Sequence, residues 1–431
     1  MSSSTPSTLP SANGRTWFGQ PPGLTVLFLT ETWERFSFYG MSALLIYYMT
    51  KQLHFSQADA SLVFGLYSGG VFLTPILGGY IADRWLGKRR AILIGGAVMA
   101  LGHFSLAWEA QFYAGLALIC LGNGLFLPNL PSQIGDLYGD DDPRRGGAYN
   151  VYYVGVNLGG LLAPLVCGTL GEVYGWHWGF GAAGVGMCIG LAVYVLGRRH
   201  LPVERAVPVV SKAKATEPLK TSAFLPLLLV GLTVMIFRSA YAQSGNTVAL
   251  WVDRAVDLQV FGFQVPATWV QSLNPLFVFL FTPLLIGHWR RAAQRKREPA
   301  PLAKMALGAA GVALSYLLLA AVALGGTHVS AAWLLLFFVV YTLAELYILP
   351  VGLGLFARAA PRGMGATVIA AWFLAAFGGN LLSGVVGRWW EPLGPAGFFA
   401  LLAGLAGVAA LGLLCLRPLL QQAEADSNSS A

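Results

Sequence analysis

Three ionisable residues stand close together in the first apolar segment of the chain: Glu31, Glu34 and Arg35. Spacings of three and four residues place them on one face of a helix. Each charge at the centre of a bilayer costs at least about 2.5 to 3.5 kcal/mol, so the three must face a polar cavity or one another. One interpretation is a buried set of ion pairs that only fixes helix packing. Two carboxylates beside one arginine favour another, because repulsion between like charges makes one carboxylate bind a proton near neutral pH.

The elements that would hold these charges are membrane-spanning helices. Of the 431 residues, 56% are hydrophobic and 11% are charged, which is about half the charged share of a soluble domain. Because a span needs about 20 apolar residues, we predict an all-α polytopic membrane protein with twelve transmembrane helices. They lie near residues 24–50, 60–82, 91–109, 111–138, 147–174, 178–197, 223–252, 266–289, 302–324, 330–357, 364–387 and 395–416.

A charged segment divides these spans into two groups of six. Residues 199–222 are rich in basic residues and contain three prolines, so we predict a cytoplasmic linker there. It would join six-helix bundles at residues 21–198 and 223–417. Two parallel six-span halves are the plan of the major facilitator fold, which binds its substrate near the midplane between them. The polar ends, residues 1–20 and 418–431, are expected to be disordered.

The basic residues predict the orientation of the spans. Most of the 27 lysines and arginines lie in connections on the side of the N-terminus. Only Lys51, Arg254 and Arg388 lie in connections on the other side, and Arg35 and Arg238 lie within spans. The positive-inside rule therefore places both termini in the cytoplasm. We expect an integral multi-pass protein of the cytoplasmic membrane, the inner membrane in a bacterium. Basic loops that face an anionic leaflet also explain the net charge of +8 without a nucleic-acid partner.

A short basic turn follows the second predicted span. The run from Gly79 through Asp83, Arg84 and Gly87 to Arg89 resembles the signature that major facilitators carry between their second and third spans. An ordinary positive-inside loop would explain the basic residues but not the ordered glycines and aspartate. We therefore interpret Asp83 and Arg84 as a motif of the cytoplasmic gate.

The first-span run is Glu31-x-x-Glu34-Arg35-Phe-Ser-x-Tyr39-Gly-Met41. It resembles the signature of the proton-dependent oligopeptide transporters (POT/PTR), a family of the major facilitator superfamily. Further matching runs are spread along the whole chain: Gly122-Asn123-Gly124, Pro128-Asn129, Tyr152 to Gly159, Ser272 to Phe277, Glu345 to Gly352, and Trp372 to Leu374 followed by Asn380. The resemblance implies a proton-coupled symporter that imports di- and tripeptides by alternating access.

The resemblance also implies a role for each matching side chain. Glu31, Glu34 and Arg35 would hold the proton, and Arg35 would also sense the peptide carboxylate. The other expected substrate contacts are hydrogen bonds from Asn157 and Asn274 to the peptide backbone, an ionic contact of Glu345 with the amino terminus, and side-chain pockets lined by Tyr39 and Trp372. Physical chemistry supports one of these independently, since a carboxylate deep in the second half needs a cation. A permanent ion pair between Glu345 and an arginine is the alternative.

The chain departs from the family pattern at several charged positions. Leu127 replaces a usual lysine, and Phe72 replaces a usual second-span tyrosine. Ser42 and Ala242 replace an arginine and a glutamate that pair across the extracellular gate. Their joint loss is physically coherent, because removing one partner alone would strand a buried charge at a cost of about 3 to 5 kcal/mol.

Arg238 is a further departure, and its position in the seventh span places it near mid-membrane. Two hypotheses remain open for it. It forms a permanent pair with Glu345, or its guanidinium binds the peptide carboxylate and replaces the charge lost at Leu127.

Two other classes of function compete with peptide transport. A major facilitator for another small solute, such as nitrate, a drug or a metabolite, is the nearest, but Glu345 suits an amino terminus and not an anion. An enzyme is not expected, because the spans hold no histidine cluster, metal-ligand pairing or nucleophile motif. We expect no cofactor other than the proton as coupling ion, no metal, and a monomer whose partners are the lipid bilayer, protons and a short peptide.

Overall fold

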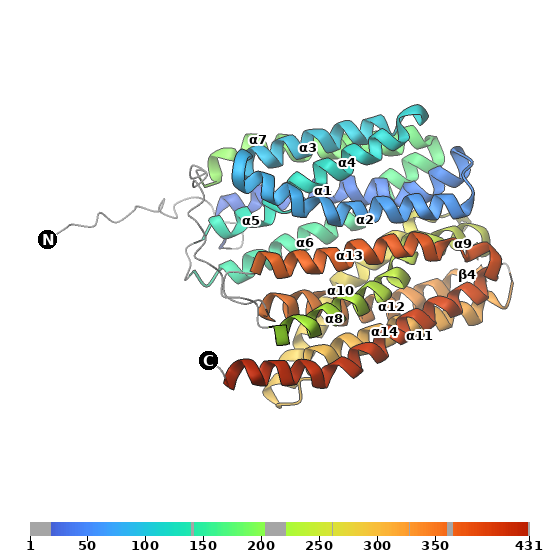
Figure 1. The fold of residues 1–431 in the computed structure, drawn as a ribbon. Coiled ribbons are helices and arrows are strands. Elements are labelled where there is room, and N and C mark those ends of the chain that lie inside the picture. The colour runs from blue at the N-terminus through green and yellow to red at the C-terminus, as the bar shows by residue number, and fades with distance from the viewer. Residues whose placement is uncertain are drawn as a thin grey trace.

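The computed structural model describes residues 19–138, 142–202, 221–260, 262–326, 328–359 and 365–429. Its long helices run side by side and form a single bundle (Figure 1). The start of α1 (Pro22–Tyr47) and the last residues of α14 (Trp390–Ser429) lie at one end of this bundle. We call it the terminal end, and the opposite end the far end.

The N-terminal half of the bundle is built around α1, which packs against α6 and α7. Short π or 3₁₀ segments extend several of its helices. In chain order the elements are α1, η1 (Tyr48–Gln52), α2 (Gln57–Ile81), η2 (Ala82–Leu86), α3 (Lys88–Ser105), η3 (Glu109–Gln111), α4 (Phe112–Phe126), α5 (Asn129–Asp136), α6 (Arg145–Ala163), η4 (Pro164–Gly168), η5 (Leu170–Tyr174), α7 (Trp176–Gly197) and η6 (Arg198–His200).

The C-terminal half has α11 packed between α12 and α14. Its elements are α8 (Thr221–Tyr241), η7 (Ala242–Gly245), α9 (Thr247–Ala255), η8 (Ala267–Ser272), α10 (Leu273–Gln294), α11 (Pro301–Ala323), α12 (Ala331–Ala359), α13 (Gly365–Gly387) and α14. At the far end, β1 (Val256–Asp257) pairs in parallel with β4 (Val329–Ser330), and β2 (Gln259–Val260) pairs antiparallel with β3 (Phe263–Gln264).

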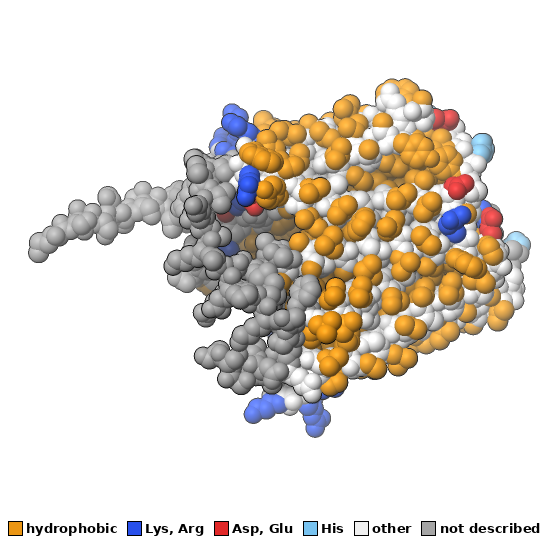
Figure 2. Space-filling model, viewed as in Figure 1, with side chains coloured by type: hydrophobic (Ala, Val, Ile, Leu, Met, Phe, Trp, Pro, Cys, Tyr) orange, Lys and Arg blue, Asp and Glu red, His pale blue; other side chains and the backbone are white. Residues whose placement is uncertain are grey.

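The lengths and compositions of the helices confirm most of the predicted spans. Within the described residues, ten helical stretches are long and apolar enough to cross a membrane. The two remaining predicted spans are α1, which carries Glu31, Glu34 and Arg35, and α3, which is 18 residues long and begins with three basic residues. Hydrophobic side chains cover the visible side of the bundle between its charged ends, as expected for a surface that faces lipid (Figure 2).

The end of the chain differs from expectation. Helix α14 continues to Ser429, so the described residues 418–429 are helical in the structure, whereas the sequence led us to expect no regular structure there. Sequence explains this, because the segment from Gln421 to Ala425 consists of Gln, Ala and Glu, which all favour helix whatever their polarity. Residues 1–18 of the predicted N-terminal tail and residues 203–220 of the predicted linker lie outside the described part of the chain.

Glycines allow the two halves to touch along α2 and α13. A methyl group on Gly65 would lie 2.5 Å from the Cα atom of Gly384, and one on Gly69 would lie 3.2 Å from the carbonyl oxygen of Phe377. No side chain fits at Gly65 without moving the backbone of the facing helix. The two helices therefore pack backbone against backbone toward the far end.

Hydrogen bonds between uncharged groups reinforce this contact. The Gln57 side-chain amide donates to the carbonyl oxygen of Gly387 (3.0 Å), and the Ser61 hydroxyl donates to Asn246 Oδ1 (3.0 Å). Gln243 links the same region to α13 by donating to the carbonyl oxygen of Ser383 (2.7 Å). We call these residues the neutral seam.

The other side of the far end is closed by Glu172 of η5. Its carboxylate accepts hydrogen bonds from the backbone N–H groups of Ala267 (3.1 Å) and Thr268 (2.8 Å), at the start of η8. The hydrogen bonds and ring contacts described between the two halves lie at the far end or near the middle of the bundle. Among them, the contact between Phe72 and Phe373 lies nearest to the terminal end. The halves are thus joined at the far end.

Candidate functional site

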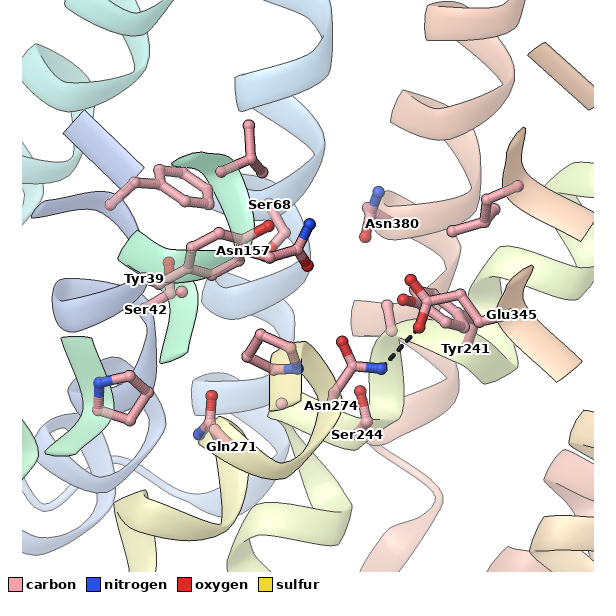
Figure 3. A pocket seen from close by; sticks show the side chains of 18 of the residues that line it. Tyr39, Ser42, Ser68, Asn157, Tyr241, Ser244, Gln271, Asn274, Glu345 and Asn380 are labelled. Carbon is pink, nitrogen blue, oxygen red and sulfur yellow. Dashed lines mark hydrogen bonds between the residues drawn. The ribbon is translucent and has the colours of Figure 1, made fainter. Parts of the chain in front are cut away.

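A cavity of about 370 Å³ lies between the two halves. It is lined from the N-terminal half by α1, α2, α6 and η4, and from the C-terminal half by α8, η7, η8, α10, α12 and α13. Figure 3 shows Tyr39 and Asn157 on one side of it and Asn274, Tyr241 and Glu345 on the other. Five of the predicted substrate residues line this cavity: Tyr39, Asn157, Arg238, Asn274 and Glu345.

The Glu345 carboxylate is held in place by a neutral donor. Asn274 Nδ2 donates to Glu345 Oε2 at 2.6 Å and contacts Thr342 Oγ1 at 3.1 Å (Figure 3). The Tyr241 side chain lines the cavity beside Glu345 (Figure 3). The bond from Asn274 orients the carboxylate without neutralising its charge. Because Nδ2 of Asn274 donates to these two side chains, Oδ1 of Asn274 remains as an acceptor for a ligand.

The Arg238 guanidinium has no anionic partner among the described residues. Its side chain is buried, with 9% of the residue exposed, and its Nε atom has no hydrogen-bond partner there. The Cζ atom lies 5.0 Å from the centroid of the Phe72 ring. No ion pair joins Arg238 to Glu345 in the described structure, so the permanent pair considered from the sequence is not formed in this conformation.

The cavity therefore has one cationic and one anionic side chain. Among its described lining residues, these are Arg238 and Glu345. Both belong to the C-terminal half, whereas the lining residues of the N-terminal half are uncharged. A ligand with one positive and one negative group matches this arrangement.

The cluster of Glu31, Glu34 and Arg35 lies beside this cavity and does not line it. Arg35 Nε is 2.7 Å from Glu31 Oε1 and 3.0 Å from Glu34 Oε2. Glu31 and Glu34 are 1% and 0% exposed, and Arg35 is 9% exposed. The prediction that the three residues share one helical face is confirmed by these contacts. Two buried carboxylates against one guanidinium leave an excess negative charge that a proton can neutralise.

Close packing of α6 fixes the place of this cluster. A methyl group on Gly159 would lie 2.4 Å from the carbonyl oxygen of Thr32 and 2.7 Å from Arg35 Cβ. On the next turn toward the N-terminus of α6, a methyl on Gly155 would lie 2.9 Å from the Thr32 hydroxyl. Between these glycines, Asn157 points to the cavity and donates from Nδ2 to the carbonyl oxygen of Tyr153 (2.9 Å), which leaves Asn157 Oδ1 available.

Two predicted substrate residues do not line the cavity. Arg35 is held by its two carboxylates, and Trp372 packs inside the C-terminal half. The Trp372 ring lies 5.2 Å from that of Phe356, and a methyl group on Gly352 would lie 2.3 Å from the indole. Trp372 therefore contacts α12 and does not line the described cavity in this conformation.

The proposed gate motif lies at the terminal end, in and around η2. Asp83 and Arg84 are exposed, and the Arg84 guanidinium carbon lies 4.8 Å from the centroid of the Tyr80 ring. Gly87, with φ of 76°, ends the segment in a conformation that favours glycine. The next residue, Lys88, forms an ion pair with Asp136 of α5 (2.6 Å). The ion pair joins α3 to α5, whereas the Arg84 contact stays within the continuous stretch of α2 and η2.

Several polar lining residues were given no role from the sequence. These are Ser42, Ser68, Tyr153, Tyr241, Ser244, Gln271 and Asn380. For Tyr241 a signal was present, because it follows Arg238 by three residues and so shares its helical face. For Gln271 and Ser244 no comparable signal exists, since both lie in 3₁₀ segments whose orientation depends on the neighbouring helices.

Comparison with known proteins identifies relatives along most of the chain. The profile described as POT family matches residues 89–207 and 202–391. The chain is 32% identical to the peptide transporter YePEPT of Yersinia enterocolitica subsp. palearctica, over 87% of this chain and 89% of that protein. It is 31% identical to a di-/tripeptide transporter of Lactococcus lactis subsp. cremoris, over 93% of this chain and 96% of that protein.

The structure is similar to that of a mutant of the peptide transporter POT in complex with alafosfalin. The TM-score is 0.88 at 30% sequence identity, with 95% of this chain and 97% of that chain covered. This likeness confirms the predicted fold, and the sequence matches confirm the resemblance inferred from the motifs. The chain therefore belongs to the POT family, whose members are transporters and not enzymes.

Proposed function

We propose that the protein imports di- and tripeptides together with protons by alternating access. The observation that carries this proposal is the cavity between the halves, whose described lining residues include one cation, Arg238, and one anion, Glu345. A short peptide is a zwitterion with its charges at its two ends. Neither a single anion such as nitrate nor an apolar drug would use both groups.

The peptide amino group would bind at Glu345, where Asn274 Oδ1 and the Tyr241 hydroxyl would supply further polar contacts. The carboxylate would bind at Arg238, whose donors suit it geometrically. The aromatic side chains of Phe64 and Phe338 also line the cavity and would contact the peptide side chains.

Proton coupling would use the buried cluster of Glu31, Glu34 and Arg35. The cluster is connected to the cavity by α1 itself, because Tyr39 follows Arg35 by one helical turn and lines the cavity. A potential of about 100 mV contributes roughly 2.3 kcal/mol per proton, and one pH unit contributes about 1.4 kcal/mol. Together they would sustain a peptide gradient of about several hundredfold.

The structure corresponds in this proposal to a carrier that is closed to the outside. The terminal end would face the cytoplasm, because the basic residues cluster on that side, and the far end would face the exterior. We propose that the protein works as a monomer in the cytoplasmic membrane, with the proton as its coupling ion and no other cofactor. Rocking of the halves would open the far end.

Uptake of a labelled dipeptide into proteoliposomes tests the function directly. With an inward proton gradient, dialanine should accumulate above its external concentration, and it should only equilibrate when an ionophore removes the gradient. Unlabelled di- and tripeptides should compete with it, whereas nitrate should not. Absence of dialanine uptake, together with gradient-driven uptake of another small solute, would instead support the alternative transporter function.

Replacing Glu345 by glutamine tests the site of the amino group. We expect Glu345→Gln to raise the half-saturating concentration of dialanine about fivefold, because the amide keeps an acceptor for Asn274 but loses the charge that attracts the ammonium group. Dialanine acetylated at the amino end should be affected less than about twofold. Competition by both peptides against labelled dialanine measures this difference.

Glu391→Gln is the matched control, since Glu391 is exposed at the start of α14, at the far end. It should leave the half-saturating concentrations of both peptides unchanged. Equal losses for free and acetylated dialanine in Glu345→Gln would contradict the assignment of the amino group to this carboxylate.

A further inference from the structure

The contact between Arg238 and Phe72 crosses the boundary between the two halves. Arg238 belongs to α8 and Phe72 to α2, and the guanidinium carbon lies 5.0 Å from the centroid of the ring. Both residues line the cavity. The Phe72 ring also lies 6.4 Å from that of Phe373 in α13. The ring thus lies at the end of the contact surface between α2 and α13.

The stem of Arg238 is packed against α13. A methyl group on Gly379 would lie 2.5 Å from Arg238 Cβ, and one on Gly378 would lie 2.2 Å from the methyl carbon of Met235. Helices α8 and α13 therefore pack too closely for Arg238 Cβ to move toward α13. The remaining freedom of the side chain is in its long terminal part, which Phe72 contacts.

An aromatic ring is a weak partner that uses none of the arginine's hydrogen-bond donors. A contact of a cation with a ring face contributes about 0.5 to 2 kcal/mol, whereas hydrogen bonds between charged groups are stronger and would occupy the N–H groups. If Arg238 were paired with a carboxylate of the protein, a substrate carboxylate would have to displace that partner. With the ring as its neighbour, Nε of Arg238 remains without a partner among the described residues.

We propose that Phe72 is a positioning residue for recognition of the substrate carboxylate. In the empty carrier its ring holds the Arg238 guanidinium at the cavity and away from Glu345, with the donors free. Because the ring and the guanidinium come from different halves, the carboxylate site is complete only while α2 and α13 are in contact. This inference rests on the proposed peptide transport and specifies how one of its contacts is prepared.

Replacing the ring tests the proposal. In Phe72→Leu, the half-saturating concentration of dialanine should rise about fivefold, a change within the range expected for loss of a cation–ring contact. Dialanine amidated at the carboxyl end has no carboxylate, so its half-saturating concentration should change less than about twofold. Phe72→Trp, which keeps a ring face, should restore the difference between the two peptides. If Phe72 only supported packing, Phe72→Leu would not change the ratio of the half-saturating concentrations of free and amidated dialanine.

Phe64→Leu is the matched control on the same helix. Phe64 lines the cavity two turns away, and its described contacts include no cation. Whatever its effect on total uptake, this variant should leave the ratio of the half-saturating concentrations of free and amidated dialanine unchanged.

A double-mutant cycle gives the decisive comparison. In the Arg238→Ala background, Phe72→Leu should cause no further change in that ratio, because the residue that the ring positions is gone. Additive effects, or equal losses for both peptides in Phe72→Leu and no rescue by Phe72→Trp, would overturn this inference. They would not affect the proposed function, which fails only if the unaltered protein shows no gradient-driven peptide uptake.

Discussion

Replacing Glu31 or Glu34 by glutamine is expected to abolish accumulation of dialanine against a gradient. Both carboxylates lie within 3.0 Å of Arg35 Nε and are almost fully buried. An amide has nearly the same shape as a carboxylic acid but cannot release or take up a proton. The final internal concentration of dialanine in proteoliposomes should therefore fall from about several hundredfold above the external one to equality.

Exchange of internal for external dialanine should persist in the same variants. An exchanging carrier returns with peptide bound, so it completes its cycle without net release of a proton. We expect exchange rates within about tenfold of those of the unaltered protein, since the amide is uncharged like the protonated carboxyl group that it replaces. Glu391→Gln serves as the control for reconstitution. If both variants still accumulated dialanine when a gradient was imposed, the role of this cluster in coupling would be wrong.

Replacing Arg238 by alanine should raise the half-saturating concentration of free dipeptides by at least about tenfold. Loss of one partner from a buried charged contact typically costs about 2 to 5 kcal/mol, and Arg238 is the only described cation that lines the cavity. Dialanine amidated at the carboxyl end should be nearly unaffected. Inhibition of labelled uptake by the two unlabelled peptides measures both values in one assay.

Two further variants separate recognition from folding. Arg254→Ala removes an exposed arginine near the end of α9 and should leave the half-saturating concentrations of both peptides unchanged. If Arg238→Ala instead lowers the yield of folded protein, and the double variant with Glu345→Ala restores it, Arg238 is a structural counter-ion. The carboxylate of the substrate would then have to bind elsewhere.

The sequence predicted the helices and the proton cluster because both depend on local spacing. Length and hydropathy locate spans, and separations of three and four residues are sufficient to bring Glu31 and Glu34 to Arg35. The same information predicted that Arg238 and Glu345 lie deep in the membrane. It did not show that the two side chains form no ion pair with each other, because this depends on the packing of α8 and α12.

Contacts between distant segments limited the rest of the prediction. Asn274 and Glu345 were expected to act on different parts of the peptide, yet they are hydrogen-bonded to each other across 71 positions of sequence. Trp372 was expected at the cavity, but most residues of α13 are apolar, so its pattern does not indicate which face Trp372 occupies. The position of Phe72 against Arg238 likewise follows only from the contact of α2 with α13.

The neutral seam has a consequence for how the carrier responds to voltage. Separation of Gln57 from Gly387 and of Ser61 from Asn246 breaks hydrogen bonds between dipoles, so these contacts carry no net charge through the membrane field when they open. Work against a membrane potential requires the movement of charge. In the proposed cycle, opening of the seam itself would thus move no net charge, and the seam would open equally readily in polarised and depolarised membranes. The electrogenic steps would be those that move charged groups through the membrane field, among them the proton cluster, Arg238 and Glu345.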